Sequence, residues 1–357
     1  MMLDYKNFFE NLIETALKKE ASDIHLVPGY YPIIRISGSL VPLLKEKVLS
    51  PEDSKQLAYL LMTEEQRKRF EKEKEIDFSF EIRGRVRLRA NVFYQKDGIS
   101  TALRLLPEKI KTIEELNLPP ILHMFTKAHQ GFVLICGPSS HGKSTTLAAL
   151  IDEINKTRRE HIITIEDPIE YVFKPDKSII EQREINTHTL SFAKALKSAL
   201  REDPDVIMIG EMRDPETMAI AITAAETGHL VFATLHTNSA AQTIHRIVDS
   251  FPAEQQSQIR AQLSGSLLGI VSQRLVPRIE GGLIPACEIM IMTPAIGNLI
   301  RENRIHEIQN IIDTSVEIGM ISLNRSLAEL VRKREIFPET ALNYSLNPNE
   351  LKLILGI

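Results

Sequence analysis

The sequence predicts an α/β protein: a small α+β domain, then a larger core with a mainly parallel sheet, then a helical C-terminal segment. Apolar and polar residues alternate over residues 22–36 and 76–91, as they do in half-buried strands. Farther along the chain, short and almost continuously apolar runs alternate with helical patterns. This texture is typical of parallel strands covered on both faces. From about Pro294 the pattern is helical and contains no further strong strand.

Composition restricts the function before any motif is considered. A length of 357 residues suggests two or three domains, and 43% hydrophobic with 25% charged residues indicates a soluble globular protein. The net charge of −4 argues against a protein that wraps nucleic acid, which needs a basic field. Cys136 and Cys287 are too few for a disulfide framework or a Cys-rich zinc site. No apolar run approaches a membrane span and the N-terminus lacks a signal-peptide pattern, so we expect a cytoplasmic protein.

The N-terminal domain is expected to span residues 1–105. A helix is predicted over residues 8–17, where the apolar side chains fall on one face. A strand is predicted over residues 100–105. Within the segment 76–91 the arginines occupy alternate positions, so they would point to one face of a strand. They are Arg83, Arg85, Arg87 and Arg89.

Residues 106–120 are interpreted as a linker because they lie between Pro107 and the pair Pro119-Pro120. The core is expected over residues 121–293, and the helical segment over residues 294–357. An amphipathic helix is predicted over residues 192–200, where apolar residues follow the helical period. The predicted core strands are Phe132–Cys136, Ile162–Ile165, Val206–Ile209 and Leu230–Leu235.

A phosphate-binding motif follows the first core strand. Residues 137–144 read GPSSHGKS, which matches G-x-x-x-x-G-K-[ST], with a strand before it and a helix after it. In such a loop the backbone N–H groups and the helix N-terminus bind phosphate oxygens. Lys143 would reach the β and γ phosphates, and the Ser144 hydroxyl would bind Mg²⁺. We therefore predict a site for a nucleoside triphosphate and Mg²⁺, formed by Gly137, Ser139, Ser140, His141, Gly142, Lys143, Ser144 and Thr145.

Two acids follow later core strands. Glu166 ends one strand and Glu211 comes just after another, which is where the functional groups of open α/β sheets emerge. One acid is needed to hold Mg²⁺, directly or through water, and another to orient or deprotonate the attacking water. Each also has a structural interpretation, because Asp167-Pro168 favours a turn and Glu211 could pair with Arg213. His229 and His236 flank the strand 230–235, and the pattern alone favours ordinary core histidines.

Several segments together are similar to a known family. They are 21–26 (ASDIHL), 137–144, 166–170 (EDPIE), 201–214 (REDPDVIMIGEMRD), 227–238 (TGHLVFATLHTN) and 251–256 (FPAEQQ). In this order they resemble the characteristic motifs of the type IV pilus retraction ATPases, which belong to the motor ATPases of secretion systems. The resemblance covers nearly the whole chain. It implies a PAS-like N-terminal domain, a RecA-like P-loop ATPase core and a homo-hexameric ring.

The resemblance also implies roles for single residues. Glu166 matches the Asp-box glutamate that acts on the attacking water, and Glu211 matches the Walker B acid that serves Mg²⁺ together with Ser144. His229 and His236 match the two His-box positions, which raises them to catalytic candidates that read the γ-phosphate and signal across a subunit boundary. Arginines from a second domain or subunit can offset charge on the phosphoryl group. The candidates are Arg87, Arg89, Arg104 and Arg246.

The same resemblance implies a setting for the motor. ATP hydrolysis would power pilus retraction and twitching motility from the cytoplasmic face of the inner membrane. The ring would contact a membrane platform protein, and pilin only indirectly. No nucleic acid and no zinc are expected.

The chain departs from the family pattern at four positions. Ser140 and His141 replace the usual Gly and Ser of the phosphate loop, and a non-glycine residue with positive φ is uncommon. Tyr94 and Gly297 stand where Arg is typical. A glycine inside a helix costs about 1 kcal/mol relative to alanine. Loss of that cation could alter coupling rather than hydrolysis.

Three other functions were weighed. A pilus-assembly or type II secretion ATPase usually carries a four-cysteine zinc insertion and a longer N-terminal region, and this chain supplies neither. A RecA-like DNA motor conflicts with the net charge of −4, although the arginines at 83–89 could line a pore. A nucleotide-gated regulator without hydrolysis is disfavoured because Glu166 and Glu211 are both present.

Overall fold

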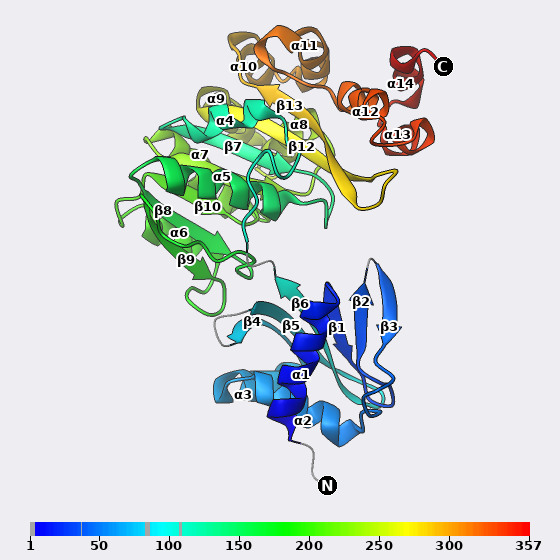
Figure 1. Cartoon of the computed structure of the whole chain (residues 1–357). Coiled ribbons are helices and arrows are strands. Elements are labelled where there is room, and N and C mark those ends of the chain that lie inside the picture. The colour runs from blue at the N-terminus through cyan, green and yellow to red at the C-terminus, as the bar shows by residue number, and fades with distance from the viewer. Residues whose placement is uncertain (1–3, 37, 83–85, 107–108) are drawn as a thin grey trace. The chain divides into compact units, whose positions relative to one another are not determined.

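The computed structural model describes residues 4–36, 38–82, 86–106 and 109–357, and Figure 1 shows the course of the chain. The chain divides into two compact units, Met1–Lys109 and Ile110–Ile357. Each has a hydrophobic core of its own. In the described part of the chain, every helix is too short or too polar to span a bilayer.

The first unit combines helices with one antiparallel sheet. Its helices are α1 (Tyr5–Lys18), α2 (Pro51–Leu61) and α3 (Glu64–Glu73). Its strands are β1 (Asp23–Leu26), β2 (Ile33–Ile36), β3 (Ser39–Pro42), β4 (Glu75–Ile82), β5 (Val86–Gln95) and β6 (Gly98–Leu106). The order in the sheet is β3-β2-β1-β6-β5-β4. Each of the two segments predicted as half-buried strand, 22–36 and 76–91, is therefore a pair of strands.

Local sequence signals set the helix boundaries of this unit. The Asp4 side chain accepts a hydrogen bond from the Asn7 backbone N–H and so begins α1. Ser50 and Thr63 each open a helix with a reciprocal capping box. The buried faces of these helices pack on the alternate apolar residues of β5 and the neighbouring strands.

Arg87 and Arg89 occupy alternate, half-buried positions of β5, so they share one face as predicted. Arg87 donates a hydrogen bond to the Ser79 hydroxyl at 2.6 Å, and Arg89 lies 3.9 Å from Asp77. Arg83 and Arg85 lie outside the described residues.

The second unit contains a larger mixed sheet. Its strands are β7 (Gly131–Cys136), β8 (His161–Glu166), β9 (Ile179–Glu184), β10 (Val206–Ile209), β11 (Leu230–Leu235), β12 (Leu267–Pro277) and β13 (Leu283–Ile291). Their order is β13-β12-β7-β11-β10-β8-β9, and only β13 runs antiparallel to its neighbour. The sequence pattern did not single out β9, β12 or β13 as strands. Because the other strands are parallel, their carboxyl ends meet along one edge of the sheet.

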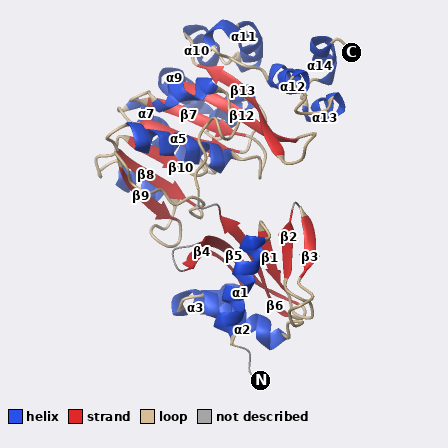
Figure 2. Cartoon of the chain, viewed as in Figure 1, coloured by secondary structure: helices blue, strands red, loops and turns tan. Residues whose placement is uncertain are grey.

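Helices surround this sheet and continue beyond it. They are η1 (Pro120–Leu122), α4 (His123–Thr126), α5 (Lys143–Thr157), α6 (Phe192–Ala199), α7 (Pro215–Glu226), α8 (Ala240–Asp249), α9 (Ala253–Ser266), α10 (Pro294–Arg301), η2 (Ile305–Glu307), α11 (Ile308–Thr314), η3 (Val316–Ile318), α12 (Leu323–Arg332), α13 (Pro338–Tyr344) and α14 (Pro348–Leu355). Figure 2 shows the chain after β13 as successive helices.

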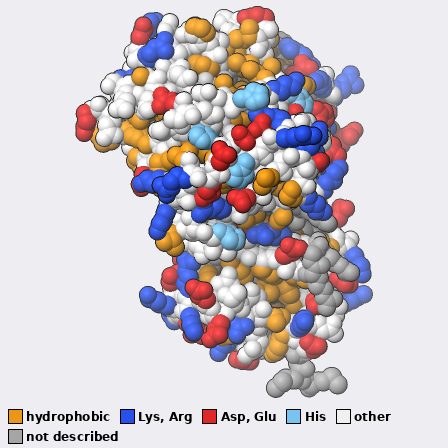
Figure 3. All heavy atoms as spheres, turned by 90° about the vertical axis from the view of Figure 1, so that its left-hand side faces the viewer, with side chains coloured by type: hydrophobic (Ala, Val, Ile, Leu, Met, Phe, Trp, Pro, Cys, Tyr) orange, Lys and Arg blue, Asp and Glu red, His pale blue; other side chains and the backbone are white. Residues whose placement is uncertain are grey.

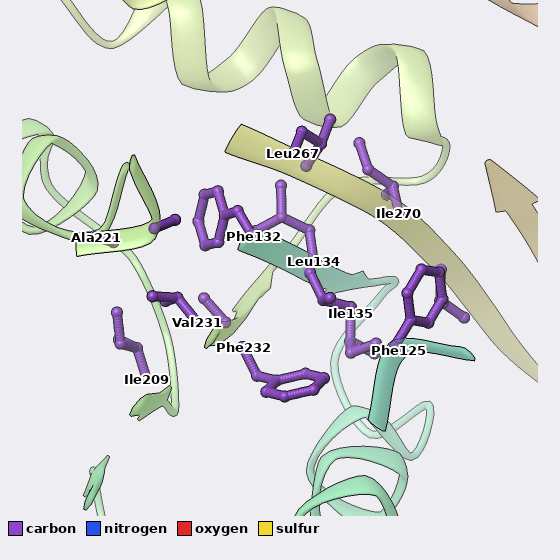
Figure 4. Packing of buried hydrophobic residues seen from close by; sticks show 14 of the residues in the cluster. Phe125, Phe132, Leu134, Ile135, Ile209, Ala221, Val231, Phe232, Leu267 and Ile270 are labelled. Carbon is purple, nitrogen blue, oxygen red and sulfur yellow. The ribbon is translucent and has the colours of Figure 1, made fainter. Parts of the chain in front are cut away.

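The central strands are buried along their whole length. All side chains of β7, β10 and β11 are buried, which fits a sheet covered on both faces. In Figure 4, Phe132 and Leu134 of β7 pack among side chains of β11 and β12. Ile113 and Leu118 belong to the same buried cluster. The part of the proposed linker from Ile110 onward is thus packed into the second unit.

Candidate functional site

The loop of residues 137–142 connects the carboxyl end of β7 to the start of α5. Gly137 and Gly142 have φ values of +146° and +79°, which side chains rarely tolerate. Ser140 also has a positive φ, +63°, so the replacement of glycine at this position leaves a serine in a left-handed conformation. The loop therefore has the strand–loop–helix context that its motif requires.

The start of α5 is suited to bind an anion. Among the described residues, no side chain caps this helix, so its first N–H groups and its dipole can serve a phosphate. Ser144 is exposed in the first turn. Lys143 is buried and donates hydrogen bonds to the carbonyl oxygens of Gly137 (3.0 Å) and Pro138 (2.8 Å). Burial lowers the pKa of Lys143, and the negative charge of Glu211 offsets part of this effect.

His236, just after β11, connects the loop to Glu211, which follows β10. His236 Nδ1 lies 3.3 Å from both Lys143 Nζ and Ser139 Oγ, and its Nε2 lies 3.3 Å from Glu211 Oε1. Because an ammonium group can only donate, Nδ1 is the acceptor and Nε2 carries the proton. Arg213 lies 2.8 Å from the other oxygen of Glu211, so the ion pair considered at the outset is present as well.

The surroundings of Glu211 favour its ionised form. Burial raises its pKa, but the hydrogen bond and charge of Arg213, together with the hydrogen bond from His236, outweigh burial and lower the pKa below its usual value. An ionised carboxylate is a suitable ligand for Mg²⁺. Within the described residues, no group of three or more His, Cys, Asp or Glu side chains could hold a metal ion without other ligands.

Glu166 ends β8 in a dry environment and is only 6% exposed. Its Oε1 accepts hydrogen bonds from the Thr164 hydroxyl (2.6 Å) and from Gln182 Nε2 (3.0 Å). Burial raises the pKa of Glu166 to about 7, although both hydrogen bonds act in the opposite direction. A carboxyl group with this pKa can accept a proton near neutral pH.

A chain of side chains joins Glu166 to the first turn of α5. Gln182 Nε2 also donates to the Tyr171 carbonyl oxygen at 2.8 Å. The Tyr171 hydroxyl in turn lies 2.9 Å from Thr145 Oγ1. The sequence analysis named neither Gln182 nor Tyr171, because nothing in their local spacing shows that they meet Glu166 and Thr145.

The imidazole ring of His141 lies against β12. Its Nδ1 accepts a hydrogen bond from the Leu275 backbone N–H of β12 at 2.9 Å. Burial lowers the pKa of His141, and the charges of Arg274 and Lys143 lower it further. The imidazole is thus neutral, and its hydrogen bond links the loop to β12. The sequence did not predict this contact. Gln273 of the same strand also contacts the loop.

His229 lies at the opposite edge of the sheet from His236. It precedes β11, its backbone oxygen accepts from the N–H of Gly131 at the start of β7, and its Nδ1 donates to the Ala224 oxygen at 2.9 Å. Six strand residues therefore separate it from His236. Within one chain the structure does not bring His229 to the phosphate loop.

The candidate arginines are also spread over the chain. Arg87, Arg89 and Arg104 belong to the first unit, where Arg104 lies 3.0 Å from Asp23. Arg246 is exposed on α8 of the second unit.

The two remaining departures have structural roles. Tyr94 stacks on Phe70 with 4.9 Å between ring centroids, and the Lys74 ammonium lies 5.0 Å from its ring. Gly297 is buried in α10, and Arg301 extends over it to donate to Ser264 Oγ at 3.0 Å. A cation one helical turn farther on thus lies against the space that a side chain at 297 would occupy.

Comparison with known proteins agrees with this geometry. Residues 5–336 match the model of the family described as type II/IV secretion system protein. The chain is 48% identical to the type IV pilus retraction ATPase PilT of Pseudomonas aeruginosa over 333 residues, 92% of this chain and 96% of the relative. It is 46% identical to a twitching motility protein of Neisseria gonorrhoeae, over 90% of this chain and 86% of the relative.

The fold is also similar to a solved structure. The crystal structure of the pilus retraction motor PilT with bound ADP superposes with a TM-score of 0.90 at 49% identity. The match covers 96% of this chain and 98% of that chain. The resemblance inferred from the motifs is confirmed. The chain belongs to the type II/IV secretion system protein family and is a member of its type IV pilus retraction ATPases.

Proposed function

We propose that the chain is a homo-hexameric, Mg²⁺-dependent ATP hydrolase that powers type IV pilus retraction. The observation that carries the proposal is the meeting of three functional parts at one edge of the sheet. These are the loop 137–142 with Lys143, the ionised Glu211 and the buried Glu166. The relatives named for pilus retraction and twitching motility supply the biological setting.

The loop and the start of α5 bind the nucleotide phosphates. Backbone N–H groups of the loop and of the uncapped helix donate to phosphate oxygens, and Lys143 adds a positive charge. The Ser144 hydroxyl and the Glu211 carboxylate would hold Mg²⁺, Glu211 directly or through water. When bound, the ion neutralises charge on the phosphate oxygens.

Glu166 acts on the attacking water. Its carboxylate accepts the proton as the water oxygen forms a bond to the γ-phosphorus and the bond to the β-phosphate oxygen breaks. The pKa of about 7 lets Glu166 take this proton at neutral pH. His236 contacts Lys143, Ser139 and Glu211 together. A change in the phosphates that these residues bind therefore changes the contacts of His236.

The proposal extends to the domains and to the assembly. Residues 1–105 form a PAS-like domain, residues 121–293 a RecA-like P-loop core, and residues 294–357 a helical segment. In a ring, a neighbouring subunit or domain supplies arginines to the site, with Arg87, Arg89, Arg104 and Arg246 as candidates. His229 would serve at such a boundary rather than in its own chain's site. The ring works at the inner membrane against a pilus platform protein and moves pilin indirectly.

Changing Lys143→Ala tests the nucleotide site. We expect ADP and ATP binding to weaken strongly, because the ammonium is the main positive charge that the loop offers to the phosphates. Binding of fluorescent ADP measures the effect. As a matched control, Lys156→Ala removes a lysine from the exposed face of the same helix, and binding should be unchanged. Equal affinity in the wild type and Lys143→Ala would contradict the proposed site.

The ring itself is tested by dilution. If arginines act across a boundary, the specific ATPase activity should fall when the protein is diluted below the concentration at which it assembles. Light scattering or mass photometry measures assembly in the same samples. Constant specific activity down to the monomer would contradict the proposed ring.

Deletion of the gene separates retraction from assembly. We expect cells with an excess of unretracted pili and without twitching motility. Bald cells would support the assembly alternative.

Acidic and basic side chains are interspersed on the face in Figure 3, in keeping with the net charge of −4 and with no role in nucleic-acid binding. Stimulation of ATPase activity by DNA would contradict that expectation.

A further inference from the structure

The side chain of Gln273 in β12 forms hydrogen bonds to both the phosphate loop and α5. Gln273 is only 2% exposed. Its Nε2 donates a hydrogen bond to the His141 carbonyl oxygen at 2.8 Å, and its Oε1 accepts one from the Thr146 hydroxyl at 2.7 Å. Thr146 is itself buried in the first turn of α5. The amide therefore joins the end of the loop to the helix that follows it.

The backbone of β12 contacts the loop at two further points. A Cβ atom on Gly137 would lie 2.3 Å from the Gln273 carbonyl oxygen, so only glycine allows this close approach. The Leu275 N–H donates to the ring of His141. Both contacts are made by backbone groups of β12, the carbonyl oxygen of Gln273 and the N–H of Leu275. This part of β12 thus lies against the loop at Gly137 and at His141.

The loop needs such support because its conformation is costly. Ser140 has a φ of +63°, a region that costs non-glycine residues about 1 kcal/mol or more, and it persists only where neighbouring structure over-determines it. Contacts from Gln273 reach the loop at His141, directly after Ser140, and fix α5 at Thr146. Losing them would leave buried polar groups unpaired on both sides.

We propose that Gln273 is a positioning residue that holds the loop in its phosphate-binding conformation through His141 and Thr146. The inference rests on the proposed function, and it adds a residue that none of the nucleotide-site motifs contains. Gln273 raises the fraction of molecules in which the loop has its phosphate-binding conformation. A fall in that population raises the apparent dissociation constant for nucleotide by the same factor.

The test is Gln273→Met, which keeps the length of the side chain and removes both hydrogen bonds. We expect the Kd for ADP and the KM for ATP to rise about tenfold, the effect of reducing the competent population by roughly that factor. The kcat at saturating ATP should stay within about a factor of two, because bound nucleotide selects the same loop conformation. Titration with ADP and steady-state phosphate release measure the two effects.

Asn155→Leu is the matched control. Asn155 is equally buried and lies on α5, and its amide bridges the Lys174 carbonyl oxygen and the Asp176 N–H away from the loop. Its loss should lower the Tm without changing Kd or KM. If Asn155→Leu raised the Kd as much as Gln273→Met for the same loss of Tm, the effect on binding would follow from lost stability alone. The role of Gln273 would then be purely structural, and the inference would be overturned.

Thr146→Val provides a second route if Gln273→Met folds poorly. This change removes the hydrogen bond from the Thr146 hydroxyl to Gln273 and leaves the one from Gln273 to His141. The Kd for ADP should therefore rise by a smaller factor. Combining the two changes should be no worse than Gln273→Met alone, because they remove a shared bond. Unchanged Kd in both single variants would refute the positioning role while leaving the proposed function intact. Failure of the wild type to bind ADP would instead overturn both.

Discussion

Glu166 at the end of β8 and Glu211 just after β10 follow neighbouring strands, yet their surroundings are opposite. Glu166 is almost fully buried and receives only neutral hydrogen bonds, so its pKa rises to about 7. Glu211 is partly exposed and lies beside Arg213 and His236, so its pKa falls. This separation of pKa values supports the proposed roles, in which Glu166 exchanges a proton near pH 7 and Glu211 keeps the charge that Mg²⁺ requires.

The largest effect is expected for Glu166→Gln. This change keeps the size of the side chain and removes its basicity, so turnover should fall by about 10²- to 10⁴-fold. The Kd for ATP should stay close to that of the wild type, because Glu166 does not hold the phosphates. Steady-state phosphate release and nucleotide titration measure the two effects. Undiminished turnover would refute the role of Glu166 as the base.

Glu211→Gln should act on the metal ion instead. Removal of the ionised carboxylate should raise the Mg²⁺ concentration needed for half-maximal activity by roughly 10- to 100-fold. Saturating Mg²⁺ should restore much of the activity, which it should not do for Glu166→Gln. Titrations of both variants with Mg²⁺ at fixed ATP test the contrast. A fall in turnover that Mg²⁺ does not reverse would place Glu211 in the proton-transfer step.

The pH profile gives a smaller, graded effect. Because a base must be deprotonated, kcat should rise with pH through about 7 and fall about tenfold per unit below it. The hydrogen bond from Thr164 lowers the pKa of Glu166, so Thr164→Val should raise it and move the acidic limb upward by roughly one unit. Turnover at pH 7 would then fall a few-fold and recover at pH 8.5. An unmoved limb would show that another group titrates.

The phosphate-binding motif and the two candidate acids could be proposed from the sequence because their signals are local. The loop 137–144 and the acids after β8 and β10 are each defined by a few adjacent residues. The contacts of Gln182 and Gln273 could not be read in this way, because their partners lie on other elements and only the folded sheet brings them together. A buried polar residue inside the apolar segment 267–276 is the one signal that could have drawn attention to Gln273.

The same limit explains the elements that were missed or misjudged. In β12, Ser272-Gln273-Arg274 interrupts the apolar run. Gln273 hydrogen bonds to the loop and to α5, and Arg274 hydrogen bonds to Asn238, so partners from distant segments satisfy these two polar side chains. Ile113 lies in a segment with prolines at both ends, yet it is 1% exposed because the core of the second unit accepts it. The opposite placement of His229 and His236 follows directly from strand direction, since a strand of six residues separates its two ends.

The smallest expected effect concerns Arg213, and it tests whether the low pKa of Glu211 matters for Mg²⁺ binding. Arg213 is largely exposed, and an exposed ion pair contributes only about 0–1 kcal/mol. Arg213→Gln should therefore weaken Mg²⁺ binding a few-fold at pH 5.5 and hardly at all at pH 8, because without Arg213 burial favours the protonated form of Glu211 at acidic pH. Isothermal titration with Mg²⁺ and ADP at both pH values measures this difference. If the effect were the same at both values, the arginine would act on the nucleotide itself, and the contrast between the two glutamates would rest on burial alone.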